Sequence, residues 1–175
     1  KAQVFQENER ITVQKNIGAK ENPHTHEFIE IVYILSGTGK EWIDGKEYPV
    51  SDGSLMFINY GQTHAFCADR EMVYYNILLE PEAVSEKIIN ADNAFAILSL
   101  TAFSDFSLAD TSNPFVSFSC AEREKLEYVL CEMYREYQSS DSGRATVLKR
   151  YLSILLAYIF RKMLPGGDRA DAAPS

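Results

Sequence analysis

The spacing of apolar positions changes once along the chain. From Ile11 to about Leu79, short apolar runs alternate with turn residues, which is typical of an all-β domain. The Asp44-Gly45 pair between two of these runs favours a type I′ hairpin. We predict a barrel-like set of six to eight strands, based on runs at Ile11 to Ile17, Phe28 to Leu35, Trp42 to Ile43, Tyr48 to Val50, Leu55 to Ile58, Thr63 to Phe66 and Met72 to Leu79.

The last third of the chain has helical spacing. Apolar residues recur three and four positions apart in Leu126 to Tyr137 and again in Val147 to Met163, which predicts two helices. Ser119 followed three residues later by Glu122 favours a capping box at the start of the first helix. We therefore expect a mainly β domain followed by two antiparallel helices.

Three segments follow from this change. We assign a ligand-binding barrel to residues 1–118, a helical hairpin to residues 119–164, and a linker or tail to residues 165–175. Pro81 is expected to open a short helix through Ile89, because proline is tolerated at the first helical position. The stretch from 91 to 118 has no clear period, and a loop is expected around Asp110 to Pro114.

The second helix is apolar on more than one stripe, since Ile154, Leu156 and Phe160 add to its main face. One barrel covers only one side of a helix. Either both helices simply cap the barrel, or the extra stripe meets a second copy of the chain. We favour the second interpretation and predict a homodimer through the helices of residues 120–163.

Charge and cysteine content narrow the function classes. Residues 1–119 carry 17 acidic and 8 basic side chains, whereas residues 120–163 carry 6 acidic and 8 basic. An acidic barrel repels phosphate backbones, so binding of nucleic acid by this part is not expected. Three scattered cysteines favour reduced thiols and a cytoplasmic protein. No apolar run reaches the roughly 18 to 20 residues of a membrane span, so no membrane partner is expected.

All three histidines fall into one ligand-like pattern. His24, His26 and Glu30 lie at even offsets and would share one face of a strand, and His64 follows in a second segment. Three imidazoles and one carboxylate suit a divalent Zn, Fe, Mn, Co or Ni ion with positions left open for water or a ligand. A single histidine is more often a surface or hydrogen-bonded residue. The agreement of all four favours a site that lines the barrel, and its occupation by a metal is left open.

The same parity predicts a ligand pocket. If His26 faces the barrel interior, then Phe28, Val32 and Ile34 do so as well. Further pocket candidates, whose parity is not fixed by the sequence, are Trp42, Phe57, Tyr75 and Asn76. Aromatic faces combined with imidazole and carboxylate groups would suit a polar ligand such as a sugar, although aromatic residues are often ordinary core.

The spacing of the glycines around these residues resembles the sequence motifs of the cupin superfamily. The spacing from Gly18 through the histidine pair and Glu30 to Gly37 is similar to the first cupin motif, and the spacing from Gly53 to His64 is similar to the second. The resemblance covers about residues 10 to 80 and implies a double-stranded β-helix, a jelly-roll-like barrel. Two positions depart from the second motif, with Asn59 in place of proline and Ala68 in place of asparagine.

A small cupin barrel followed by two helices resembles the N-terminal sensing and dimerisation domain of AraC-type transcriptional regulators. The similar features are the runs His24-Thr25-His26 and Glu30 to Leu35, the step from Tyr48-Pro49-Val50 to Gly53-Ser54-Leu55, and Glu136 followed by Leu148 to Arg161. The resemblance implies a small effector in the barrel, pairing of two protomers by the helices, and DNA binding by a C-terminal helix-turn-helix module.

Only 12 residues follow Met163, so the DNA-binding module is absent from this chain. We expect the chain to be either a trimmed piece of a longer regulator or a free-standing cupin, and the first Lys1 and the linker-like ending favour the former.

The alternative function is a metal-dependent small cupin enzyme, an isomerase, decarboxylase or dioxygenase. A site of three histidines and one glutamate with open positions can activate water or bind a substrate oxygen. The sequence offers no clear additional acid or base: Glu27, Glu41 and Tyr33 are possible, but none has a spacing that demands the role. We therefore assign no catalytic residue and prefer a binding function to an enzyme.

Overall fold

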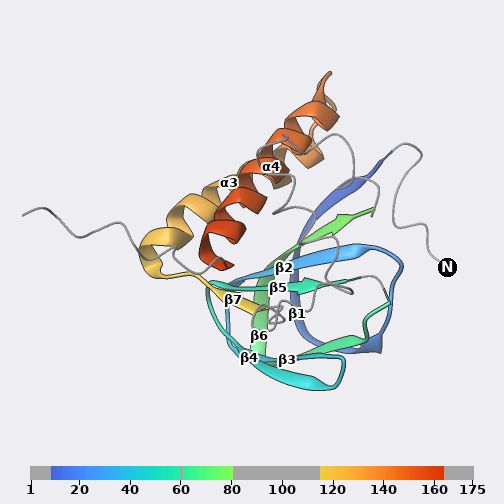
Figure 1. The fold of residues 1–175 in the computed structure, drawn as a ribbon, viewed down its shortest axis with the longest axis vertical. Helices are drawn as coiled ribbons and strands as arrows, with labels where there is room; N and C mark the ends of the chain where they lie inside the picture. The colour runs from blue at the N-terminus through green and yellow to red at the C-terminus, as the bar shows by residue number, and fades with distance from the viewer. Residues whose placement is uncertain (1–8, 60, 81–114, 164–175) are drawn as a thin grey trace, which may run out of the picture.

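The computed structural model describes residues 9–59, 61–80 and 115–163, which form a curled antiparallel sheet with two helices lying across it (Figure 1). The elements, in chain order, are β1 (Ile11–His24), β2 (Ile29–Ser36), β3 (Gly39–Ile43), β4 (Lys46–Val50), β5 (Ser54–Ile58), β6 (His64–Leu79), β7 (Phe115–Ser117), α3 (Cys120–Gln138) and α4 (Arg144–Met163). The expected fold class is confirmed. The helix predicted at Pro81 to Ile89 and the loop predicted at Asp110 to Pro114 lie outside the described residues.

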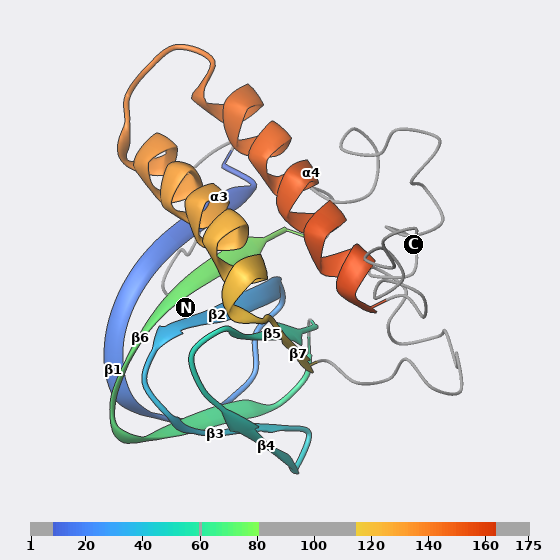
Figure 2. The ribbon, with the colours of Figure 1, turned by 90° about the vertical axis from the view of Figure 1, so that its left-hand side faces the viewer.

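The long strand β6 organises the sheet. Its first residues pair with β3, its later residues pair with β2, and β1 runs antiparallel to it from the His24–His64 pair to the Ile11–Leu79 pair. The order β4-β3-β6-β2-β5-β7, with β1 also on β6, curls into a barrel-like shape (Figure 2). The separate strands predicted at Thr63 to Phe66 and Met72 to Leu79 are one strand, because pairing with β1 continues along most of its length.

The β3–β4 hairpin turns as predicted. Asp44 and Gly45 have φ values of 50° and 79°, and a type I′ turn requires a positive φ at both central residues. The Asp44 carboxylate accepts a hydrogen bond of 2.9 Å from the backbone N–H of Thr63 and one of 2.8 Å from Gln62 Nε2. The turn is thereby fixed to the segment that leads into His64.

Strand β2 is buried on both faces, and its two faces belong to different apolar clusters. Ile29, Ile31 and Tyr33 join the cluster between the barrel and the helices, whereas Val32 and Ile34 join the cluster inside the barrel. Residues at even positions of β2 therefore point into the barrel interior. This side of the strand also carries Glu30.

Helices α3 and α4 form an antiparallel hairpin over one side of the barrel (Figures 1 and 2). The backbone N–H and the hydroxyl of Ser119 each donate a hydrogen bond of 2.7 Å to the Glu122 carboxylate at the start of α3, which agrees with the predicted cap. Lys162 of α4 lies 3.1 Å from the same residue and links the two helices. Neither described helix combines the length and the apolar character needed to cross a membrane.

One of the three residues predicted to form a second apolar stripe on α4 is buried in the core of the chain itself. Leu156 is buried in the shared core of the barrel and the helices, while Ile154 is 43% exposed. The side chain of Phe160 lies outside the described part of the chain. The prediction was therefore wrong for Leu156, because this residue lies on the side of α4 that packs into the core.

Candidate functional site

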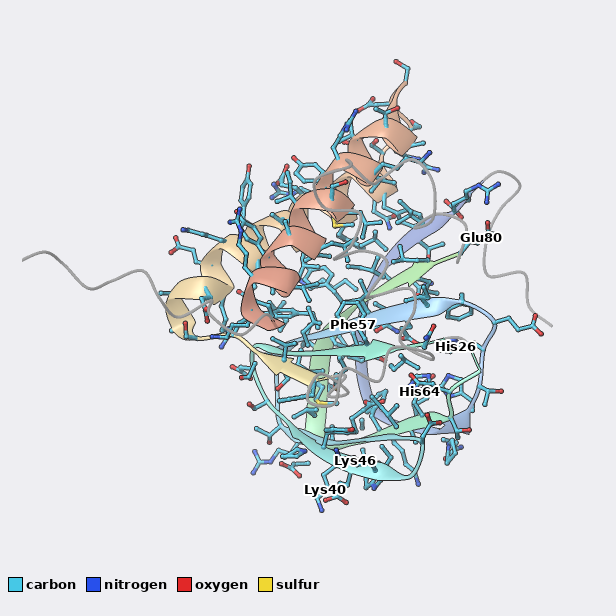
Figure 3. All side chains as sticks on the ribbon, in the orientation of Figure 1. His26, Lys40, Lys46, Phe57, His64 and Glu80 are labelled. Carbon is cyan, nitrogen blue, oxygen red and sulfur yellow. The ribbon has the colours of Figure 1, made fainter. Side chains whose placement is uncertain are left out.

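Three of the four predicted ligand-type side chains converge at one end of the barrel. His26 lies in the connection between β1 and β2, Glu30 is the second residue of β2, and His64 is the first residue of β6. Figure 3 shows His26 and His64 near each other. One potential ligand atom from each of the three residues lies within 4.8 Å of the others. The fourth residue, His24, ends β1 beside His64.

The parity argument for the histidines was wrong in its detail. It assumed one extended strand from His24 to Glu30, but β1 ends at His24 and β2 begins only at Ile29. The side chains come together because the end of β1 pairs with the start of β6, where His24 is the partner of His64. For the residues within β2 the parity holds: Glu30, Val32 and Ile34 all line the inner cavity.

Glu30 lies between the two buried imidazoles. Its Oε2 atom is 3.0 Å from Nε2 of His26 and 3.4 Å from Nε2 of His64. The three side chains are between 2% and 6% exposed, so they are shielded from bulk water. This arrangement places two ring nitrogens and one carboxylate oxygen around a common point.

The hydrogen bond made by Nδ1 of His26 fixes the tautomer of the ring. Nδ1 lies 2.8 Å from the backbone carbonyl of Phe28. A carbonyl can only accept, so Nδ1 of His26 carries the proton and donates. In the neutral ring, Nε2 then presents a lone pair toward Glu30.

His64 contacts a second carboxylate at its other nitrogen. Nδ1 lies 3.2 Å from Oε1 of Glu41, a residue of β3 that is 2% exposed. Burial, together with the negative charges of Glu30 and Glu21, raises the pKa of Glu41 to about 9. Burial also lowers the pKa of His64, which favours the neutral imidazole.

The inward-facing atoms suit a divalent cation. Among the described residues, Nε2 of His26 and Nε2 of His64 are buried and make no hydrogen bond, although Oε2 of Glu30 lies 3.0 and 3.4 Å from them. Buried polar atoms without partners are rare, and each calls for an explanation. Two imidazole nitrogens and a carboxylate oxygen are a donor set that Zn, Fe, Mn, Co or Ni accepts.

His24 lies close to this group without joining it. Its ring centroid is 4.2 Å from that of His64 and 6.0 Å from that of His26. However, Nδ1 of His24 is 3.0 Å from the backbone carbonyl of Asn22, and Nε2 is 3.6 Å from the Glu21 carboxylate. The ring would have to reorient to add a third nitrogen to the cluster.

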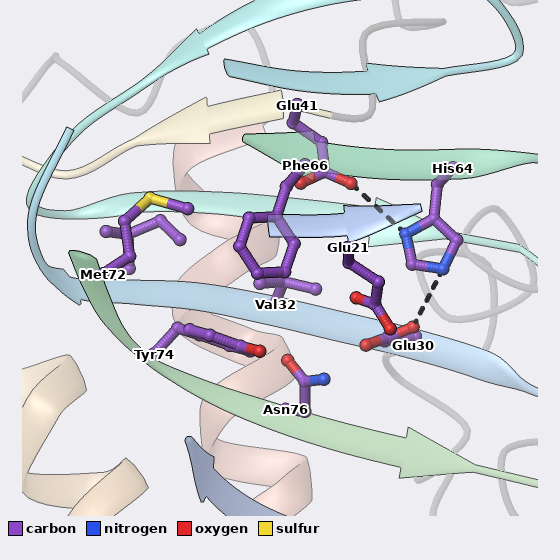
Figure 4. A pocket seen from close by; sticks show the side chains of 10 residues that line it. Glu21, Glu30, Val32, Glu41, His64, Phe66, Met72, Tyr74 and Asn76 are labelled. Atoms are coloured by element: carbon purple, nitrogen blue, oxygen red, sulfur yellow. Dashed lines mark hydrogen bonds and ion pairs between the residues drawn. The ribbon is translucent and has the colours of Figure 1, made fainter. Parts of the chain in front are cut away.

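The cavity beside the cluster is small. Its volume is about 10 Å³, which is close to the space that one water molecule requires. Figure 4 shows Glu30, Glu41 and His64 at one end and apolar side chains at the other. The lining residues are Glu21, Glu30, Val32, Ile34, Glu41, His64, Phe66, Met72, Tyr74 and Asn76.

A larger hollow adjoins the same strands. Its volume is about 480 Å³, and it is bounded by Trp42 with Lys20, Thr63 and Cys67 among its other residues. Glu21, His64 and Phe66 line both this hollow and the inner cavity. The hollow therefore has the size of a small-ligand site, about 300 to 1,000 Å³.

Three of the predicted pocket residues line neither the inner cavity nor the larger hollow. Phe57 and Tyr75 belong to the cluster that packs against the helices, since they occupy the opposite face of their strands, and Tyr75 contacts Tyr134 of α3. Phe28 instead stacks on His26 with a centroid distance of 4.0 Å. The sequence did not show which face of each strand meets the helices, and a part of these three residues in ligand binding stays a prediction.

Sequence reasoning did not select Glu21 and Tyr74 for the cavity, and it considered Glu41 only as a possible acid or base. Glu41 and Ile43 alternate with Lys40 and Trp42, and this period of two is the signal that could have placed Glu41 inside. Glu21 follows a shift in the pairing register of β1 with β6 after Gly18, and no sequence pattern predicts this shift.

Part of the chain is similar to a known protein family and to regulators of transcription. Residues 14–94 match the model of the AraC-like ligand binding domain. The HTH-type transcriptional activator RhaR of Escherichia coli (strain K12) is 30% identical over 59 residues, which are 34% of this chain and 21% of that protein. RhaR of Enterobacter sp. (strain 638) is 27% identical over 70 residues, 40% of this chain and 25% of that protein. The chain thus matches about a fifth to a quarter of the length of these curated relatives.

Solved structures with similarity to the chain include cupins. A cupin protein from Bacteroides fragilis has 27% identity and a TM-score of 0.38, with 41% of this chain and 66% of that chain covered. A predicted oxalate decarboxylase from Thermotoga maritima has 23% identity and a TM-score of 0.35, with 40% and 64% covered. The match to the family model agrees with the resemblance in the sequence: residues 14–94 are similar to the AraC-like ligand binding domain.

Proposed function

We propose that this chain is the effector-binding and dimerisation part of an AraC-type transcriptional regulator. The observation that carries the proposal is the match of residues 14–94 to an AraC-like ligand-binding domain, since this segment contains every residue that lines the inner cavity. In this proposal a small molecule binds at the barrel and changes how two protomers are arranged. DNA is bound through a C-terminal helix-turn-helix module outside this chain.

The effector is a sugar-sized polar molecule that occupies the larger hollow. The inner cavity admits only a water-sized particle, whereas the hollow of about 480 Å³ can hold a monosaccharide. Trp42 offers an aromatic face, and Lys20, Glu21 and Thr63 supply polar groups around it. Sites for small molecules commonly combine an aromatic or apolar wall with a few polar groups.

Tryptophan fluorescence tests this proposal directly, because Trp42 is the only tryptophan in the chain. A monosaccharide that binds in the hollow should shift or quench the emission and raise the melting temperature. Calorimetry on Trp42→Ala should then detect weaker binding, while Ile17→Ala, at an exposed position of β1 that lines neither the hollow nor the inner cavity, should bind like the wild type. A sugar that binds Trp42→Ala with unchanged affinity would refute the assignment of the hollow.

The inner cluster is proposed to bind a divalent metal ion, one of Zn, Fe, Mn, Co or Ni. His26, Glu30 and His64 would hold the ion, and His24 could join them if its ring reorients. Elemental analysis of protein purified without chelator decides occupancy. His26→Ala should abolish the binding, because it removes one of the two buried nitrogens that face Glu30.

The helical hairpin is proposed to form the homodimer interface. Tyr128 on α3 and Val147 and Ile154 on α4 are 65%, 38% and 43% exposed, although all three are large hydrophobic residues. Such residues on neighbouring helices support a contact with a second copy. Light scattering of the purified chain over a range of concentrations tests this part of the proposal.

The competing function is a metal-dependent enzyme of the small cupin type. The cluster of His26, Glu30 and His64 favours it, because three protein ligands leave positions at an ion for water or a substrate. Purified protein that contains no metal and gains none on incubation would remove this alternative and leave the regulator proposal intact.

A further inference from the structure

His64 faces a carboxylate at each of its ring nitrogens (Figure 4). Nδ1 is 3.2 Å from Oε1 of Glu41, and Nε2 is 3.4 Å from Oε2 of Glu30. A neutral imidazole carries one N–H, so it donates on one side and offers a lone pair on the other. The side that carries the proton therefore decides whether His64 can act as a ligand in the cluster.

His26 provides a comparison within the same site. Its Nδ1 donates to the backbone carbonyl of Phe28, which leaves Nε2 free to face Glu30. Glu41 takes the position at Nδ1 of His64 that the carbonyl takes at His26. If Glu41 accepts from Nδ1, both histidines present their Nε2 lone pairs to the same point.

The fold holds Glu41 in this position. Glu41 pairs with Phe66 across β3 and β6, and Phe66 is two residues from His64, so all three side chains point into the barrel. Glu41 and His64 are each 2% exposed, so bulk water does not compete for the contact. A buried carboxyl group without a hydrogen-bond partner is unfavourable, so the contact with His64 helps to hold Glu41 in this position.

We propose that Glu41 is the positioning residue of the metal centre: it accepts a hydrogen bond from Nδ1 of His64 and thereby directs the Nε2 lone pair toward Glu30 and His26. This inference rests on the metal site proposed above. Partners behind a histidine ligand fix its ring and its tautomer, and their loss lowers metal affinity about 10- to 100-fold. Glu41 would not contact an ion itself and would act on it only through His64.

Zinc titration of three variants tests the role. In competition with a chromophoric chelator, Glu41→Leu should bind Zn²⁺ about 10- to 100-fold more weakly than the wild type. Glu41→Gln should stay close to the wild type, because its amide oxygen also accepts from Nδ1. Glu47→Leu is the control, since Glu47 lies on the adjacent strand β4 and pairs with Lys40 at the surface. Circular dichroism verifies that each variant is folded.

Nitrogen NMR of the histidine rings gives a readout that needs no variant. In the zinc-bound wild type, His64 should be protonated at Nδ1 and coordinated through Nε2. Coordination through Nδ1, or zinc affinity in Glu41→Leu equal to that of the wild type, would overturn the role of Glu41 and leave the metal site standing. Failure of the wild type to bind Zn²⁺ would overturn the metal site together with this inference.

Discussion

The hydroxyl of Tyr33 donates a hydrogen bond of 2.7 Å to Oε1 of Glu127 and so joins the barrel to helix α3. Arg123 reaches the same carboxylate oxygen at 3.0 Å and donates to the backbone carbonyl of Leu35 at 3.2 Å. Tyr33 lies on the helix-facing side of β2, whereas its neighbours Val32 and Ile34 line the inner cavity. One strand therefore carries both the cavity wall and a polar contact to the proposed dimerisation helices.

Tyr33→Phe should destabilise the chain by about 1 to 2 kcal/mol, because it removes one hydrogen bond to a charged group in a buried setting. Urea unfolding followed by circular dichroism measures the change. Tyr128→Phe is the matched control on α3, since Tyr128 is 65% exposed, and it should change stability by less than about 0.5 kcal/mol. Equal effects of the two changes would show that the Tyr33–Glu127 contact contributes little.

Gly53→Ala should be more harmful than Gly45→Ala. Both glycines have positive φ values, 83° and 79°, so both changes carry similar backbone strain. A Cβ atom at Gly53 would lie 2.9 Å from Cδ of Arg123 and 2.9 Å from the backbone carbonyl of Phe118, whereas one at Gly45 would meet open space. The difference between the two melting temperatures therefore measures how tightly the β4–β5 turn packs against the start of α3, and equal melting temperatures would contradict this packing.

The raised pKa of Glu41 predicts a pH dependence of stability when divalent ions are removed with a chelator. In the folded protein this pKa is about 9 instead of the usual 4.5, so between these values the folded state holds a proton that the unfolded state releases. The contribution of Glu41 is fully present below pH 4.5 and is lost as the pH rises toward 9, by at most about 1.4 kcal/mol per pH unit. Glu41→Gln should remove this dependence.

The comparison is best made by denaturant unfolding between pH 7 and pH 9, because His64 has a lowered pKa and stays neutral in this range. Wild-type stability should fall relative to that of Glu41→Gln as the pH rises. Parallel curves for the two proteins would contradict the assignment of the titration to Glu41.

Local chemistry made some features of this fold predictable. The Asp44-Gly45 hairpin and the Ser119 cap follow from short-range rules, and the structure contains both. The fold class followed from the change of apolar period. By contrast, every described residue from Ile29 to Ile34 is buried, so the sequence could not show which face of β2 meets the helices.

The site was predictable in its residue types and less so in its geometry. His26, Glu30 and His64 come together because the end of β1 pairs with the start of β6, and this long-range register has no local signal. The same limitation explains why Phe57 and Tyr75 were assigned to the pocket although they pack toward the helices. The role proposed for Glu41 depends on its distance to His64, and this distance cannot be read from the sequence.

Substitutions at two adjacent residues of α4 should distinguish loss of the dimer from loss of the folded core. Ile154 is 43% exposed, whereas Leu155 is fully buried between the helices and the barrel. Ile154→Lys should shift the chain from dimer to monomer in light scattering and leave its circular dichroism and melting temperature nearly unchanged. Leu155→Lys should instead unfold the chain or lower its stability by several kcal/mol, because it places an unpaired charge in the core. A wild-type chain that is monomeric at high concentration, or an Ile154→Lys variant that remains dimeric, would contradict the proposed interface.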